Sequence, residues 1–329
     1  MNKLLLLLAL FAAPATALDL VFIGDVMLAD GPGRTIAAGG DPLAEFDAEL
    51  RGADFSIANL ECPVARSGKA LENKIWTFRA DPAVLAVLKG RIGAVSLANN
   101  HSGDYGPGAF VETLDHLAAA RLPFFGGGRN LAQAHAPLWV EKRGLKIAVL
   151  GYDEFKPRSF EAGAKWPGVA WSEDRQVLAD IRAARAAGAD LVIPFMHWGW
   201  ESETRPSARQ WQLAKRMIEA GADAVVGSHP HVTQGADVYR GRPIVWSLGN
   251  FVFDGFSSPE TTHGWLLRMR LDRKGVVAFE TRVAAIDETG TPHLSNGVSP
   301  CWRRGQTRVG LCQARPGGLD APTPKADGR

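Results

Sequence analysis

The stretch GADAVVGSHPH at residues 221–231 places a Gly-Ala-Asp entry, a short apolar run and two histidines in order. A similar sequence of glycine-containing entry, apolar run and polar residue occurs at 188–197, 52–61 and 92–101. These units end on a histidine, a glutamate and an Asn-Asn-His run, respectively. Glycine tolerates the left-handed conformation that often ends a helix. Each unit therefore predicts a helix or turn, then a buried strand, and then a polar side chain.

Between these units, short apolar runs alternate with longer amphipathic ones, which predicts an α/β fold. We expect strands at 20–23, 55–60, 94–98, 138–140, 145–150, 191–195, 224–226 and 244–248, and a hairpin of strands at 265–271 and 276–283. We expect helices at 82–88, 107–120, 173–187 and 207–220. Ligands of open α/β sheets bind outside the carboxyl ends of the strands, so polar residues that follow these strands are candidates for a site.

The composition favours no charged partner. The chain has 329 residues, enough for one sizeable core, and a formal net charge of +2. It has no basic stripe with interleaved aromatic residues, so we expect no nucleic-acid partner. Nor does the charge favour an anionic membrane surface.

Residues 1–17 have the pattern of a secretory signal peptide. Lys3 precedes an apolar run at 4–13, and Ala15-Thr16-Ala17 fits a cleavage site. The run is too short to span a bilayer. The alternative, a buried N-terminal strand or helix, leaves the basic start and the Ala-x-Ala end unexplained. We therefore expect a periplasmic or secreted protein that begins near residue 18, without a later transmembrane segment.

The alternating pattern ends near residue 287, so we expect one domain at 18–287. Residues 288–329 are rich in Gly, Pro and Arg and predict an irregular arm, with a flexible tail after Pro316. Export permits disulfides, and Cys301 and Cys312 flank a short loop, so we expect them to pair. We interpret Cys62 as a small buried residue rather than a nucleophile.

Polar side chains that follow the predicted strands form one candidate set: Asp25, Glu61, Asn100, His101, His197, His229 and His231. Singly, such an Asp is usually a cap or turn residue, and such a His is usually structural. Carboxylates and imidazoles that converge on one sheet edge need a compensating charge, however, and a bound cation supplies it. Nitrogen and oxygen donors without an obvious thiolate favour Mn, Fe or Zn over a calcium cage. We therefore predict a site for one or two divalent ions.

Six sequence blocks resemble, in order, the motif series of the CapA/PgsA family of poly-γ-glutamate capsule biosynthesis proteins. These blocks are GDVML at 24–28, NLE at 59–61, LANNH at 97–101, HWGWE at 197–201, GSHPH at 227–231 and SLGNF at 247–251. CapA proteins are in turn similar to calcineurin-like metallophosphatases. This similarity implies a four-layer fold in which two β-sheets are flanked by helices.

The resemblance also implies roles for the candidate residues. The metal ligands would be Asp25, Glu61, Asn100, His197, His229 and His231. The catalytic residues would be Asn100 and His101, with the histidine as general acid or electrostatic group, and Pro230 would help to turn the chain between the last two ligands. Met27 stands where metallophosphatases usually carry a histidine, which predicts a weaker or absent second ion.

Further residues are expected around this centre. The substrate-binding candidates are Lys74, Arg79, Trp198 and Asn250. The two cations would attract an anionic substrate, or are ordinary solvated loop charges. Asp104 and Glu201 are expected to accept hydrogen bonds from ligand imidazoles. Alternatively, Asp104 caps the following helix and Glu201 is a surface residue.

Together these features predict an exported metal-dependent hydrolase, linked to biosynthesis of a poly-γ-glutamate-type polymer. Its substrate would be an anionic envelope or capsule-type polymer, or a phosphoester. The alternative is a non-catalytic accessory subunit that binds polymer within a membrane-associated synthesis and export complex. The hydrolase needs its metal for activity, whereas polymer binding by an accessory subunit survives chelation.

Overall fold

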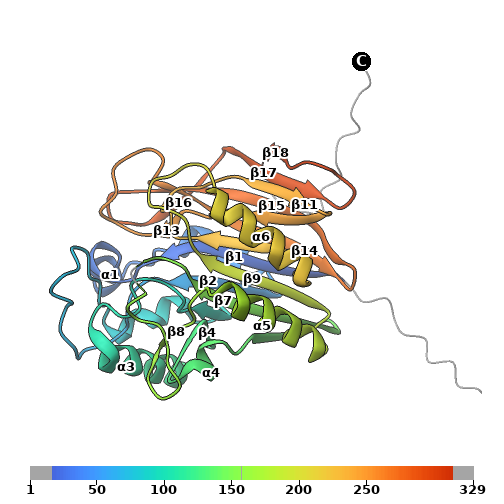
Figure 1. Ribbon diagram of the computed structural model, residues 1–329. Helices are drawn as coiled ribbons and strands as arrows, with labels where there is room; N and C mark the ends of the chain where they lie inside the picture. Colours follow the sequence, from blue (N-terminus) through green and yellow to red (C-terminus); the bar gives the residue numbers. More distant parts are fainter. Residues whose placement is uncertain (1–16, 157, 314–329) are drawn as a thin grey trace, which may run out of the picture.

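The computed structural model describes residues 17–156 and 158–313, which form two large β-sheets and a small ribbon (Figure 1). The order of the ten-stranded sheet is β18 (Gly310–Gln313), β17 (Val298–Arg303), β15 (Gly275–Ile286), β14 (His263–Asp272), β1 (Leu18–Val26), β2 (Phe55–Leu60), β3 (Ala94–Ser96) and β4 (Phe124–Phe125). Off this path, β13 (Asn250–Val252) pairs with β1, and β16 (Pro292–Ser295) pairs with β15.

The six-stranded sheet has the order β11 (Ala236–Tyr239), β12 (Arg242–Val245), β10 (Val225–Ser228), β9 (Leu191–His197), β7 (Leu145–Asp153) and β6 (Leu138–Lys142). The ribbon pairs β5 (Gly127–Gly128) with β8 (Gly168–Val169). The α-helices are α1 (Asp30–Ala37), α2 (Asp47–Arg51), α3 (Gly106–Ala119), α4 (Leu131–Ala134), α5 (Asp174–Ala186) and α6 (Ala208–Ala220). Two 3₁₀ helices are η1 (Ala44–Phe46) and η2 (Pro82–Leu88).

Alternation along β1 explains how the layers stack. Leu20 and Phe22 pack against apolar residues of β7, β9 and β10, so this core lies between the two sheets. Val21 and Ile23 belong to a second core, which includes residues of η2 and α3. A third core joins the outer face of the six-stranded sheet to α5 and α6, which lie along its strands (Figure 1). The predicted four layers, with two sheets flanked by helices, are confirmed.

The predicted helices and interior strands are found near their expected positions. The segment at 82–88 is a 3₁₀ helix whose start is capped by Asp81, which accepts a hydrogen bond from the Ala83 amide. Gly188 and Gly221 have φ values of 86° and 119°, as a left-handed helix end requires. Gly52 ends α2 in the right-handed region instead, at φ −75°. Within the described ranges, no helix has the length and apolar character needed to cross a bilayer.

The expectation of an irregular arm after residue 287 is wrong for its described part. Strands β16, β17 and β18 extend the ten-stranded sheet, because β15 offers an edge with free backbone donors and acceptors. A disulfide joins Cys301 in β17 to Cys312 in β18. Residues 1–16, with most of the predicted signal peptide, and the predicted tail after Pro316 lie outside the described residues.

Candidate metal centre

The polar residues converge where the carboxyl ends of parallel strands meet. Asp25 lies at the end of β1 and Glu61 directly follows β2, its parallel neighbour. His197 ends β9, and His229 directly follows β10, which runs parallel to β9 in the other sheet. The two sheets therefore contribute carboxylates and imidazoles to one place.

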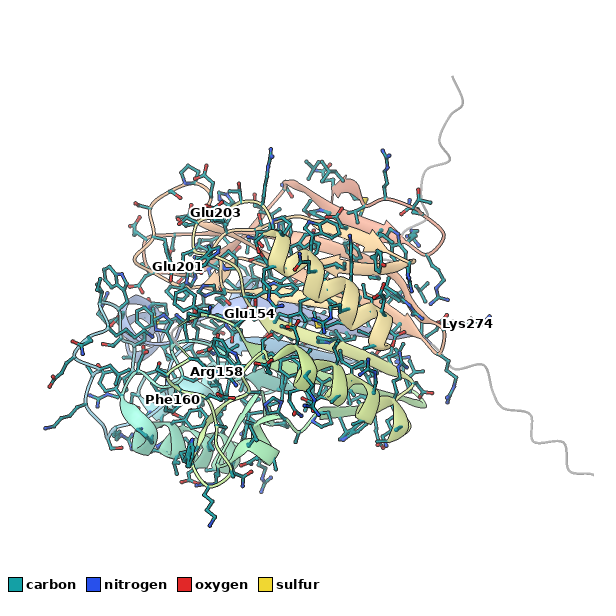
Figure 2. All side chains as sticks on the ribbon, viewed as in Figure 1. Glu154, Arg158, Phe160, Glu201, Glu203 and Lys274 are labelled. Carbon is teal, nitrogen blue, oxygen red and sulfur yellow. A yellow bond between two sulfur atoms is a disulfide. The ribbon has the colours of Figure 1, made fainter. Side chains whose placement is uncertain are left out.

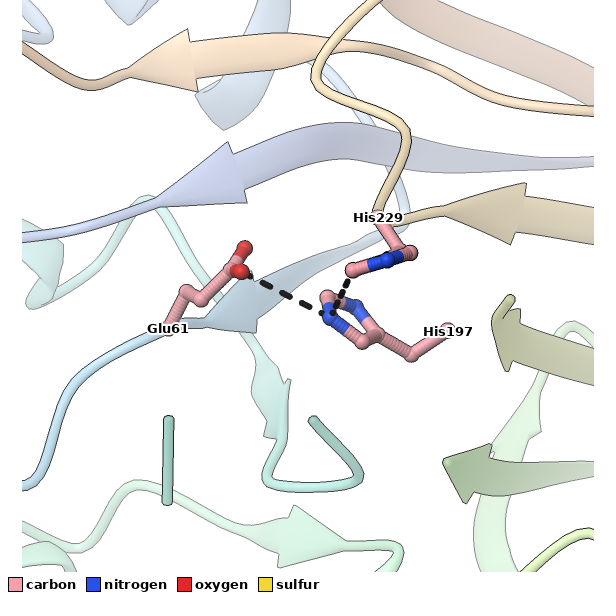
Figure 3. A group of neighbouring side chains, drawn as sticks. All are labelled: Glu61, His197 and His229. Atoms are coloured by element: carbon pink, nitrogen blue, oxygen red, sulfur yellow. Dashed lines mark hydrogen bonds and ion pairs between the residues drawn. The ribbon is translucent and has the colours of Figure 1, made fainter. Parts of the chain in front are cut away.

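Two overlapping groups of side chains have the spacing of metal ligands. Glu61, His197 and His229 form one, and Asp25, Glu61 and His231 form the other. Within each group the donor atoms lie within 4.8 Å of one another, and every member is buried. Figure 3 shows the first group, with Glu61 facing the two imidazoles. Because Glu61 belongs to both groups, it is placed to bridge two ions.

The His197 Nε2 atom has more close polar neighbours than a single proton or lone pair can satisfy. Its Nε2 lies 2.7 Å from Asn100 Oδ1, 3.0 Å from His229 Nδ1 and 3.5 Å from Glu61 Oε1. A neutral ring nitrogen either carries one proton or offers one lone pair. A cation, by contrast, accepts lone pairs from several such atoms at once. The amide oxygen of Asn100 thus lies beside these donor atoms, and its role as a ligand stays a prediction of the resemblance.

Two buried polar atoms lack a hydrogen-bond partner among the described residues: Glu61 Oε1 and His229 Nε2. An unpartnered buried polar atom costs about 1–3 kcal/mol, so such atoms are uncommon in native interiors. Both belong to the first ligand group. The donor set fits a divalent transition metal, because it mixes imidazole nitrogen with carboxylate oxygen and contains no thiolate.

Burial dominates the electrostatics of this cluster. It raises the pKa of Asp25, and together with the nearby Asp25 charge it raises the pKa of Glu61 well above its ordinary value. Burial, followed by repulsion from neighbouring imidazoles, lowers the pKa of His197 and His229 well below the ordinary value. Burial also lowers the pKa of His231. The imidazoles are therefore neutral, which is the ligating form, and a bound cation would restore the ionised carboxylates.

Asn59 holds both carboxylates and received no role from the sequence. Its Nδ2 donates to Asp25 Oδ1 at 2.8 Å and to Glu61 Oε2 at 3.1 Å. Asn99 in turn donates to Asn59 Oδ1 at 3.0 Å and to the Leu60 carbonyl at 2.8 Å. The sequence did contain a signal for Asn59, because it is a polar residue inside an apolar strand. An unpaired amide is costly there, so such a residue needs polar partners.

His101 lies in a buried group with Asp104 and Lys74. Its Nδ1 is 2.8 Å from Asp104 Oδ2 and 3.1 Å from Lys74 Nζ. Asp104 is fully buried and also accepts from the Phe78 amide at 2.8 Å. It therefore orients the His101 imidazole, whereas the prediction concerned the imidazole of a metal ligand, and His101 is in neither ligand group. Burial lowers the pKa of His101, so its imidazole is neutral near pH 7.

Three residues expected to bind substrate make contacts within the protein instead. Arg79 points its guanidinium over the Tyr105 ring and donates to carbonyls of the 66–68 loop. Trp198 is fully buried in the core, where its Nε1 donates to the Trp246 carbonyl. Asn250 is also fully buried, with its Oδ1 2.8 Å from His231 Nδ1. Arg79 thus stabilises the 66–68 loop, Trp198 supports the core, and Asn250 orients the His231 imidazole.

Lys74 and Glu201 also differ from expectation. The Lys74 ammonium contacts the Asn100 carbonyl, His101 and Asp104, so its charge is paired within the protein. Glu201 is exposed on the turn after β9 and accepts no hydrogen bond from a site imidazole among the described residues (Figure 2). The alternative surface position is the one the structure has for Glu201.

Strained backbone marks the end of β10. His229 and His231 have φ values of 98° and 56°, in the left-handed region that disfavours side chains with a Cβ. Such strain is retained at sites where the surrounding structure fixes it.

Met27 is buried in the core, where its Sδ accepts from the Ala29 amide at 3.1 Å. Cys62 is buried as predicted, and burial raises the pKa of its thiol to about 12.

Comparisons with known proteins identify the family. Residues 19–255 match the family described as "Bacterial capsule synthesis protein PGA_cap". The chain belongs to this family. Curated proteins are also similar to this PGA_cap chain. The "PGA biosynthesis protein CapA" of Bacillus subtilis (strain 168) is 32% identical over 273 residues, which cover 81% of this chain and 71% of the relative. The "Capsule biosynthesis protein CapA" of Bacillus anthracis is 33% identical over 250 residues, which cover 72% of this chain and 60% of the relative.

A solved structure supports the fold of this PGA_cap chain. The 5'-nucleotidase precursor from Thermus thermophilus aligns with a TM-score of 0.53 and 13% identity, covering 84% of this chain and 56% of that one. At such low identity the likeness concerns the fold alone. It agrees with the predicted calcineurin-like metallophosphatase fold, which is confirmed, as is the resemblance to CapA proteins.

Proposed function

We propose that this PGA_cap protein is an exported, metal-dependent hydrolase that acts on an anionic capsule-type polymer of the poly-γ-glutamate kind. This proposal rests on two unpartnered buried atoms, Glu61 Oε1 and His229 Nε2. A protein that needed these side chains only for packing would have no reason to bury them without partners. The capsule link is supported by the family and by the names of its Bacillus relatives.

One ion, Mn, Fe or Zn, would be held by Glu61, His197 and His229, with Asn100 close by. A second would be held by Asp25, Glu61 and His231 and would bind more weakly, because Met27 offers it no ligand. Such an ion supplies Lewis-acid chemistry to a carbonyl or phosphoryl oxygen of the substrate.

His101 is the proposed general acid. Asp104 accepts from its Nδ1–H, so a proton for the leaving group would be given from Nε2 when the ring is an imidazolium, the form that the neighbouring Asp104 charge favours. Lys74 contacts both groups and the Asn100 carbonyl, so it is a positioning residue. His101→Gln should lower kcat by about 10²–10⁴-fold while metal content stays unchanged.

Export by the signal peptide at 1–17 and association with a polymer-synthesis membrane complex belong to the same proposal. Removal of residues 1–17 should retain the protein in the cytoplasm, which cell fractionation measures.

Elemental analysis of purified protein tests the metal centre, together with turnover of ester, phosphoester and γ-glutamyl amide substrates. We expect bound transition metal, activity that chelation abolishes, and loss of both in His229→Ala. Glu201→Ala is the matched control, because this exposed residue lies near the site without contacting the ligand imidazoles. Metal-replete protein that turns over no substrate but binds polymer equally well after chelation would instead support the accessory subunit.

A further inference from the structure

A cavity of about 380 Å³ lies beside the candidate metal centre. Its lining includes Lys74 and Asn100 from the centre, Asp153 at the end of β7, and the aromatic residues Phe160 and Trp171. Asn100 belongs both to this lining and to the contacts of His197, so a molecule in the cavity adjoins the ligand cluster. None of the groups assigned above explains what the cavity holds.

Both cations of the lining are already paired within the protein. Lys74 uses its ammonium on Asn100, His101 and Asp104. Arg158 lies on the segment that follows β7 (Figure 2). It makes two hydrogen bonds to Glu161, at 2.5 and 2.6 Å, and one to Glu173 at 3.2 Å. An anionic group that entered the cavity would therefore meet no cation free to pair with it.

Asp153 is the opposite case. Its side chain lines the cavity, and the residue is only 5% exposed. Oδ1 accepts a hydrogen bond from the Phe155 amide at 3.0 Å, and none of the described residues donates to Oδ2, which retains some contact with solvent. Asp153 is in neither group of candidate metal ligands. A ligand in the cavity can therefore donate to this carboxylate oxygen, and charge-assisted hydrogen bonds of that kind are among the stronger ones.

We propose that Asp153 binds an ammonium group of the substrate, so that the cavity selects a chain end with a free amine next to the metal centre. This specificity rests on the proposed hydrolase function. A carboxylate in this lining suits an ammonium, because a charge-assisted hydrogen bond between the two is favourable, whereas the Trp171 ring is already contacted by the Arg158 guanidinium, 5.3 Å from its centroid. A phosphate group, which proteins commonly hold with free Arg or Lys, finds no such partner here.

Calorimetric titration with two probes tests this assignment. The probes are the γ-linked dipeptide of glutamate with a free amine and its N-acetyl derivative, which differ only at the amino group. We expect the free amine to bind about tenfold more tightly to the wild-type chain, because a hydrogen bond between charged groups is worth that much or more. Asp153→Asn keeps the side-chain shape and should abolish the preference by weakening the amine probe alone.

Glu72→Gln is the control variant, because it removes an exposed carboxylate from the same lining and should change the preference less than twofold. The titrations are run on metal-replete and on chelated protein, since the preference should persist without metal even if hydrolysis does not occur. Equal binding of the two probes, binding of neither, or a preference that survives in Asp153→Asn overturns the assignment. If that variant does not fold, the two probes on the wild-type chain still decide.

Discussion

Single side chains at this site are held by neighbours that are not ligands. Asn59 illustrates this, since one amide group donates to Asp25 and Glu61 and thereby keeps two carboxylates a short distance apart. Without a cation these like charges repel, and burial makes the repulsion stronger. The amide supplies part of the compensation that the metal would complete.

Replacing Asn59 with Leu removes this donor and leaves two buried carboxylates short of a partner. We expect the variant to lose about 1–3 kcal/mol of unfolding free energy when metal-free. Metal affinity should fall by about 10–100-fold, as for other residues that orient ligands. Urea unfolding and metal titration measure the two effects. The exposed Asn296 is the control, and Asn296→Leu should change neither quantity.

Asp153 gives the metal-free protein a specific pH dependence. Burial raises its pKa to about 7, whereas the unfolded value is about 3.9. Between pH 4 and 7 the folded state therefore holds a proton that the unfolded state has lost, so stability falls as pH rises. This contribution is about 1.4 kcal/mol per pH unit.

Asp153→Asn should remove that contribution, so the difference in unfolding free energy between variant and wild type should grow in favour of the variant from pH 4.5 to 7. Urea unfolding across this range, with chelator present, measures it. Parallel pH profiles for the two proteins would contradict the raised pKa.

At the scale of elements, the apolar pattern of the sequence predicted the buried strands and the polar residues that follow them. The apolar runs before His197 and His229 are buried strands of the six-stranded sheet, and both histidines follow where expected. Strand β18 was missed because all its side chains are exposed, so its pairing depends on backbone hydrogen bonds that leave no apolar pattern. The contacts of Arg79, Trp198 and Asn250 could not be predicted for another reason: position along the chain does not determine which way a side chain points.

The disulfide between β17 and β18 should therefore stabilise one edge rather than the whole fold. In the double variant Cys301→Ser/Cys312→Ser, we expect β18 to separate locally, because its exposed side chains give it little packing. Hydrogen exchange should rise at 298–313 and stay unchanged in β9 and β10. Loss of bound metal in this variant would contradict a purely local effect.

At the scale of the whole molecule, the centre joins the two sheets. Asp25 and Glu61 come from the ten-stranded sheet, and His197 and His229 from the six-stranded one. An ion that binds only this folded arrangement stabilises it by mass action, by about 2.7 kcal/mol at a free concentration 100 times Kd. The inter-sheet packing and the centre should thus support each other.

Thermal unfolding in graded metal tests this link. The wild-type Tm should rise with the concentration of free metal, and His197→Ala should show no such rise. Glu201→Ala should behave as wild type. A metal-dependent Tm that persists in His197→Ala would place the ion elsewhere.

The position of β1 has a consequence for how the chain is made. It pairs with β2 on one side, while Leu18 to Ile23 pair with residues 266–271 of β14 on the other. Residues 18–23 of this strand therefore lack one neighbour until nearly the last part of the fold has been synthesised, and such distant pairings form slowly. A nascent chain that stops at residue 260 contains every candidate ligand and β13, whose Asn250 pairs with Asp25, yet residues 18–23 of β1 are still open along one edge. We expect such a chain to bind no metal, so acquisition of the ion would mark the completion of the polypeptide.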